Sequence, residues 1–104
     1  MRTENIIQTL IAEKNYDRHQ TERLAAKIDG LSEDIRAALE NWLETGEIEG
    51  PEYSGYTAQR ILNEKPGMTV LAAYLALDWI KNDSKTAIKA ILTPVMRFMP
   101  NAKK

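Results

Sequence analysis

The chain has no cysteine among its 104 residues, and glycine and proline are sparse, with five and four copies. Without cysteine there can be no disulfide bond, no thiolate nucleophile and no thiolate metal site. A reducing compartment therefore suits the chain, and we predict that it has no redox role. We likewise predict no cofactor and no bound metal, because Gly-rich phosphate loops, His-Glu-x-x-His and calcium-loop spacings are all missing.

Long hydrophobic runs are also missing. The longest run, Val70–Leu77, has eight residues and is followed at once by Asp78, whereas a membrane-spanning helix needs roughly 20. The N-terminal residues lead into a stretch interrupted by polar side chains, which is typical of neither a secretory signal nor a mitochondrial presequence. We therefore predict a cytoplasmic protein that does not enter a membrane.

The apolar residues that are present recur at spacings of three and four, without sustained two-residue alternation. This pattern predicts an all-α fold. With 104 residues, 43% of them hydrophobic and 28% charged, the chain has the size of one domain. We expect a single helical domain over residues 1–104, with 100–104 as a disordered tail. Its architecture should be a compact bundle of five or six short helices around a central apolar helix at about 69–81.

Three helices are predicted in the N-terminal half. The first follows Thr3 as a candidate N-cap and runs to about residue 15 or 16. The second, shorter one ends at Gly30, where glycine can adopt the left-handed conformation that stops a helix. The third begins after Ser32 as the N-cap and ends at Gly46. Its apolar stripe comprises Ile35, Ala38, Leu39, Trp42 and Leu43.

The C-terminal half contains an expected loop over residues 47–56, a short helix over 57–63, the apolar helix and a last helix that begins at Asp83 or Ser84. Pro94 should end or kink that last helix. The apolar helix has no polar face, so we expect its neighbours to enclose it on every side. Trp42 and Trp79 lie on apolar stripes, which favours a place in the core for both.

Catalysis has little support in this sequence. His19 is the only histidine, and it lies in a polar junction where a surface or capping role is favoured. The many carboxylates between Glu33 and Glu52 fall on a predicted helix exterior or in a loop, where water surrounds them. We therefore predict that the chain is not an enzyme and has no catalytic residue.

Charge is distributed unevenly along the chain. Residues 1–52 hold 12 acidic and 6 basic side chains, and residues 53–104 hold 3 acidic and 8 basic. The two halves either pair weakly inside one bundle or form an acidic and a basic face. Lys81, Lys85 and Lys89 form one basic ridge if the break near Asn82 is mild. A nucleic-acid-associated regulator that uses this basic half is the alternative function.

A helix-turn-helix is the other route to nucleic acid. Residues 24–35 resemble the Leu-Ala-x-x-Leu-Gly-Val-Ser pattern of bacterial repressors, with Asp29 as an extra residue before the turn glycine. The candidate recognition helix, however, offers Glu33, Asp34, Glu40 and other acidic residues to a polyanion, whose phosphates favour lysine and arginine. An ordinary helical hairpin is the favoured interpretation.

Binding residues are predicted in two places. The segment 53–60 contains Tyr53, Tyr56 and Arg60, and tyrosine with arginine is the composition of interaction hot spots. Alternatively, one tyrosine plugs the bundle end and the other lies on the surface. The C-terminal segment contributes Met96, Phe98 and Met99, which either pack on the bundle or bind another protein or a second copy.

Residues 55–62 and 72–80 resemble small uncharacterised all-helical proteins of bacterial genomes and conjugative elements. That resemblance implies a bacterial cytoplasmic protein and transfers no site residue. Together these observations predict a non-enzymatic protein-interaction or adaptor module.

Overall fold

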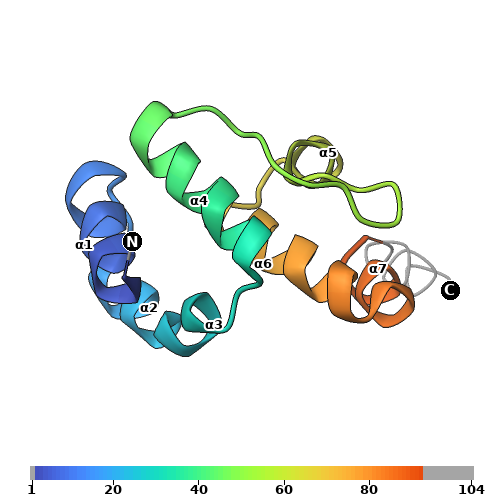
Figure 1. Ribbon diagram of the computed structural model, residues 1–104, viewed down its shortest axis with the longest axis horizontal. Helices are drawn as coiled ribbons and strands as arrows, with labels where there is room; N and C mark the ends of the chain where they lie inside the picture. Colours follow the sequence, from blue (N-terminus) through green and yellow to red (C-terminus); the bar gives the residue numbers. More distant parts are fainter. Residues whose placement is uncertain (1, 93–104) are drawn as a thin grey trace, which may run out of the picture. The chain divides into compact units, whose positions relative to one another are not determined.

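The computed structural model describes residues 2–92, and seven α-helices account for all the helices and strands in this part of the chain (Figure 1). The all-α prediction is therefore confirmed. The helices are α1 (Thr3–Glu13), α2 (Arg18–Arg23), α3 (Ala25–Asp29), α4 (Glu33–Thr45), α5 (Ala58–Glu64), α6 (Val70–Asn82) and α7 (Ser84–Leu92). None of the helices within residues 2–92 is long and apolar enough to cross a membrane.

Contacts divide the chain into two compact units, with the boundary between Pro51 and Glu52. Unit 1 contains α1 to α4, and unit 2 contains α5 to α7. The assignment of residues 1–104 to a single domain stays a prediction.

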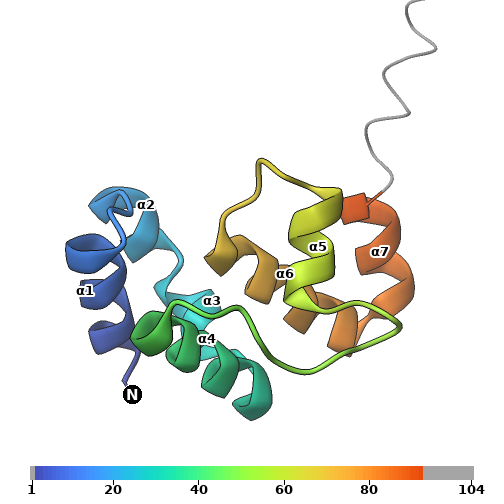
Figure 2. The same cartoon turned by 90° about the horizontal axis from the view of Figure 1, so that it is seen from above.

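In unit 1, α1 packs against α2, α3 and α4 (Figure 2). Its core contains fully buried side chains from α1, α3 and α4, and those from α4 belong to the predicted stripe: Ile6, Leu10, Ile28, Ile35 and Leu39. The end of α4 also follows the prediction, because Gly46 takes the left-handed conformation at φ 81° and its amide donates to the carbonyl of Trp42. A residue with a Cβ pays a steric penalty in this conformation.

Three local predictions in unit 1 are wrong. Thr3 is not the N-cap of α1; Arg2 holds that position, and the Thr3 hydroxyl instead donates to Asp29, 26 residues away. The predicted second helix corresponds to α3 and does not include Leu24, where the backbone breaks at φ −90° and ψ 0°. The helix before this break, α2, was not predicted, and it raises the helix count from five or six to seven. Gly30 ends α3 with φ −86°, so its left-handed freedom is not used.

The left-handed residue after α1 is Asn15, at φ 59°. Both Lys14 and Tyr16 then donate their amides to the carbonyl of Leu10, at 3.2 and 3.0 Å. The Lys14 ammonium consequently lies 4.9 Å from the centroid of the Trp42 ring, and the Tyr16 ring meets that ring edge-on at 6.4 Å. The prediction that Trp42 belongs to the core is confirmed.

In unit 2, α6 packs against both α5 and α7, and Figure 2 draws the three helices side by side. Threonine hydroxyls cap two of them: Thr57 accepts from the amide of Arg60, and Thr69 accepts from the amide of Ala72. Six residues of α6 are buried: Leu71, Ala73, Tyr74, Ala76, Leu77 and Ile80. The central position of this helix among the helices of its own unit follows the prediction.

The expected enclosure of α6 on every side is wrong, and so is the core position of Trp79. The Trp79 side chain is 41% exposed, and among the described residues no other large hydrophobic side chain is classed as exposed. Leu75, one turn earlier on the same face, is half-buried. In unit 2, α5 and α7 cover only part of the circumference of α6. Some apolar side chains of α6 therefore stay at least partly exposed.

The predicted basic ridge is interrupted. Asp83 separates α6 from α7 with φ −155° and ψ 72°, so Lys81 does not continue the helical spacing of Lys85 and Lys89. The latter two are exposed on α7, one turn apart.

Candidate functional site

The segment predicted as a structureless loop contains a tight turn. Tyr53 and Tyr56 form an isolated antiparallel bridge, in which each amide donates to the other's carbonyl at 2.8 Å. Between them, Ser54 and Gly55 have φ values of 53° and 83°. Two consecutive left-handed residues between paired residues define a type I′ turn. The turn therefore has a specified conformation, and it holds the two tyrosines opposite each other at its base.

Arg60 connects this turn to α5. Its Nη1 donates to the carbonyl of Gly55 at 2.7 Å, and its Nε donates to Glu64 Oε2 at 2.9 Å, one helical turn further along. Its guanidinium carbon lies 4.2 Å from the centroid of the Tyr56 ring. Three contacts thus fix the orientation of one arginine side chain.

A second cation covers the other tyrosine. The Lys81 ammonium, at the end of α6, lies 5.2 Å from the centroid of the Tyr53 ring. We call this group of five residues the turn surface: Tyr53, Tyr56, Arg60, Glu64 and Lys81. Cations over aromatic rings are attracted to the negative face of the ring, so the charges and rings of the turn surface stabilise one another.

The electrostatics of Arg60 follow from its partners. The hydrogen bond with Glu64 is the main cause that raises the pKa of Arg60, and the charge of Glu52 contributes in the same direction. The guanidinium remains exposed despite these contacts, with about half of the side-chain surface accessible. It is therefore both oriented and available to a binding partner.

Two hydrogen-bond donors of the turn surface have no acceptor among residues 2–92. They are Nη2 of Arg60 and the hydroxyl of Tyr56, neither of which takes part in a hydrogen bond there. Within the described part of the chain no buried side-chain nitrogen or oxygen lacks a partner, so the hydroxyl of the half-buried Tyr56 reaches the surface. The hydroxyl belongs to the ring that the guanidinium covers, so both donors are part of the same cation–ring pair.

Only some of the binding residues predicted from the sequence can be placed in the structure. The structure brings Tyr53, Tyr56 and Arg60 together, whereas Met96, Phe98 and Met99 lie outside the described residues. Sequence reasoning missed Lys81, which is 28 positions from its ring, and it missed Glu64. The i,i+4 spacing of Arg60 and Glu64 is a signal that could have identified this pair.

His19 is exposed on α2 and approaches no acidic cluster: residues 2–92 hold no group of three or more His, Asp or Glu side chains able to bind a metal ion. Its position near the beginning of α2 is a surface one. Asp17, not His19, caps that helix by accepting from the amide of Gln20 at 2.9 Å.

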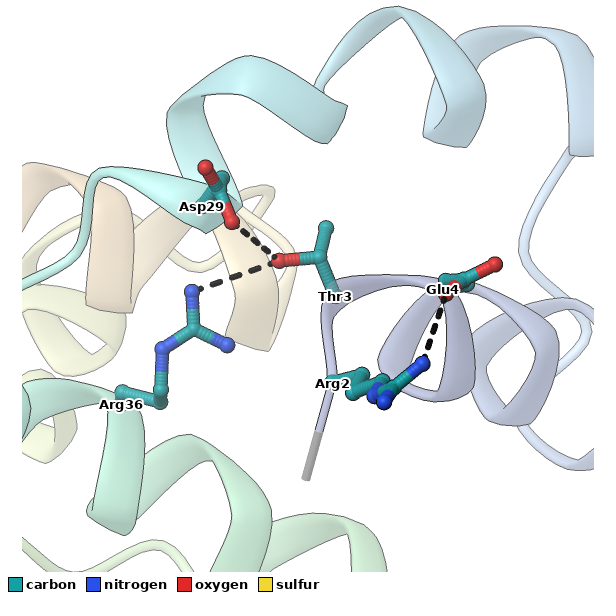
Figure 3. Close-up of a pocket in the computed structure, with 5 residues that line it drawn as sticks. All are labelled: Arg2, Thr3, Glu4, Asp29 and Arg36. Carbon is teal, nitrogen blue, oxygen red and sulfur yellow. Dashed lines mark hydrogen bonds and ion pairs between the residues drawn. The ribbon is translucent and has the colours of Figure 1, made fainter.

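Unit 1 has a polar depression of its own, with a volume of about 600 Å³, lined by Arg2, Thr3, Glu4, Asp29 and Arg36 (Figure 3). Arg36 Nη2 donates to the carbonyl of Ile28 at 2.6 Å and to the Thr3 hydroxyl at 3.4 Å, and this hydroxyl donates to Asp29 Oδ1 at 2.9 Å. These bonds join α1, α3 and α4. Because the polar groups satisfy one another, we interpret this cluster as a structural connection.

No family model matches the chain, and comparison with curated proteins and with solved structures likewise finds no match.

Proposed function

We propose that this chain is a non-enzymatic protein-interaction module that binds its partner through the turn surface. The observation that carries the proposal is the orientation of Arg60, which is fixed by Gly55, Glu64 and the Tyr56 ring while about half of its surface stays accessible. Arginine and tyrosine dominate interaction hot spots. Groups held in place before binding lose less conformational freedom when the partner arrives.

The nucleic-acid alternative draws on the basic half of the chain, of which the described helix α7 carries Lys85 and Lys89 and no acidic residue. The other basic residues of that predicted face lie outside the described residues: Arg97, Lys103 and Lys104. The interruption at Asp83 separates Lys85 and Lys89 from Lys81. Within the described residues these two lysines supply few phosphate contacts, whereas affinity for nucleic acid grows with the number of phosphates neutralised. The turn surface therefore supports protein binding better than α7 supports nucleic-acid binding. A cytoplasmic location belongs to the same proposal, because the chain has no cysteine that would require an oxidising compartment.

The test compares two double variants of the full chain. Tyr56→Ala with Arg60→Ala removes the oriented pair, and Lys85→Ala with Lys89→Ala removes two exposed cations from another helix. Both are used as bait, with the unaltered chain, in a lysate of the organism that encodes the chain, with chemical cross-linking and mass spectrometry.

We expect a protein that the unaltered chain and the lysine variant capture and the turn variant does not. Cross-links from this protein should fall on residues 53–64. Capture that is equal for all three baits, or cross-links that cluster around Trp79 instead, would contradict the proposal.

A further inference from the structure

The chemistry of the turn surface also indicates what kind of partner it binds. Both of its unused groups, Arg60 Nη2 and the Tyr56 hydroxyl, can donate hydrogen bonds. A guanidinium never accepts a hydrogen bond, and its planar N–H groups match the two oxygens of a carboxylate. An acceptor that carries negative charge would therefore complete this pair of donors.

The groups around this arginine determine which of its nitrogens is available. Lys81 adds a positive charge over the neighbouring ring, and Glu64 holds the guanidinium through Nε, leaving Nη2 free of any acceptor among the described residues. We infer that the turn surface binds an acidic peptide segment of its protein partner, with one carboxylate accepting from Arg60 Nη2 and the Tyr56 hydroxyl. This inference rests on the proposed function and specifies the chemistry of the partner.

Glu64 gives the inference a distinctive consequence. It positions the guanidinium, but its own negative charge also opposes an incoming carboxylate. Glu64→Gln keeps an oxygen acceptor for Nε and removes this charge. The variant should therefore bind an acidic peptide more tightly, which neither unfolding of the variant nor simple loss of a contact can produce.

The experiment measures fluorescence anisotropy of a fluorescein-labelled hexaglutamate peptide, a matching hexaglutamine peptide and a ten-residue thymidine oligonucleotide. We expect hexaglutamate to bind and hexaglutamine not to bind. Arg60→Ala should weaken hexaglutamate binding by about tenfold or more, as expected for a hot-spot residue. Glu64→Gln should strengthen it about two- to fivefold, the size of an exposed charge interaction.

Lys85→Ala is the matched control, because it removes one exposed positive charge of unit 2 outside the turn surface; its binding should stay within about twofold of the unaltered chain. An equal loss in Lys85→Ala and Arg60→Ala would mean diffuse attraction and overturn the inference. The inference would also be overturned if hexaglutamate did not bind, or if Glu64→Gln bound it no more tightly than the unaltered chain. The same holds if the oligonucleotide bound more tightly than hexaglutamate and lost this binding in Arg60→Ala. If the lysate experiment still yields a partner at residues 53–64, the interaction function stands and only the acidic chemistry fails.

Discussion

Replacing Gly55 with alanine tests the conformation on which the turn surface depends. The backbone at Gly55 has φ 83°, and a Cβ placed there would lie 3.5 Å from Arg60 Nη1, which is ordinary van der Waals contact. Steric overlap with Arg60 is therefore not the source of any effect. The cost comes from the left-handed conformation itself, at about 1–2 kcal/mol for a residue with a side chain.

Hydrogen exchange measured by NMR reports this cost locally, at the amides of Tyr53 and Tyr56 that bond across the turn. A loss of about 1–2 kcal/mol corresponds to about five- to thirtyfold in the equilibrium between closed and open turn. Gly55→Ala should accelerate exchange of both amides by that factor. Ser54→Asn should slow it, because asparagine tolerates the left-handed conformation better than serine and Asn-Gly is the preferred pair for a type I′ turn.

Gly67→Ala is the control for the substitution itself. Gly67 has no positive φ and no neighbouring atom within 4 Å of an added Cβ, so alanine there should leave the turn unaffected. The left-handed turn would be refuted if the amide exchange rates of Tyr53 and Tyr56 in Gly55→Ala stayed within about twofold of those in the unaltered chain. A change of the same size in Gly67→Ala would show that the effect is not local.

Three further outcomes are expected. Gly46→Ala should lower the free energy of unfolding by about 1 kcal/mol in urea titrations, since its φ of 81° penalises a side chain that meets no atom within 4 Å; no change would contradict the left-handed end of α4. In single-tryptophan variants, acrylamide should quench Trp79 more strongly than Trp42, because their exposed fractions are 41% and 8%, and equal quenching would contradict the exposed position on α6. Arg36→Ala should destabilise the chain by about 1–3 kcal/mol, because it removes the guanidinium hydrogen bond between α4 and the Ile28 carbonyl and leaves this carbonyl with only the longer bond from the Leu31 amide; an unchanged urea midpoint would show that water replaces the guanidinium.

Local patterns predicted the helices well where the determinants are close in sequence. The helix between Ser32 and Gly46 has a stripe, an acidic first turn and a terminating glycine within 15 residues, and all five stripe residues are buried. Thr3 shows the limit of such signals. A threonine before an apolar stripe is a favourable N-cap. The Thr3 hydroxyl, however, donates to Asp29 in another helix, and no local sequence pattern predicts that partner.

Three of the five residues of the turn surface were singled out together from the sequence, but their geometry was not predicted. One bridged pair is too short to show the two-residue alternation that identifies strands, so residues 47–56 resembled a loop without structure. The Ser-Gly pair between two tyrosines was the available hairpin signal. Lys81 could not have been placed over Tyr53, because that contact depends on how α6 packs in unit 2.

Trp79 illustrates a different limit, which concerns α6 as a whole. A helix that is apolar nearly all round is typical of a buried position, and this pattern identifies the helix correctly. It does not state how many neighbours the helix has. With α5 and α7 as its partners in unit 2, α6 leaves Trp79 at the surface.

The charge that a partner meets at the turn surface differs from the net charge of −1 carried by the whole chain. Arg60 and Lys81 are opposed by Glu64 and by the nearby Glu52, so the local charge is close to balanced. An acidic peptide held by one carboxylate should consequently show a shallow dependence of affinity on salt. Nucleic acid would show a steep one, because each neutralised phosphate releases counterions. The slope of a salt titration thus distinguishes oriented recognition by one arginine from general attraction to the lysines of unit 2.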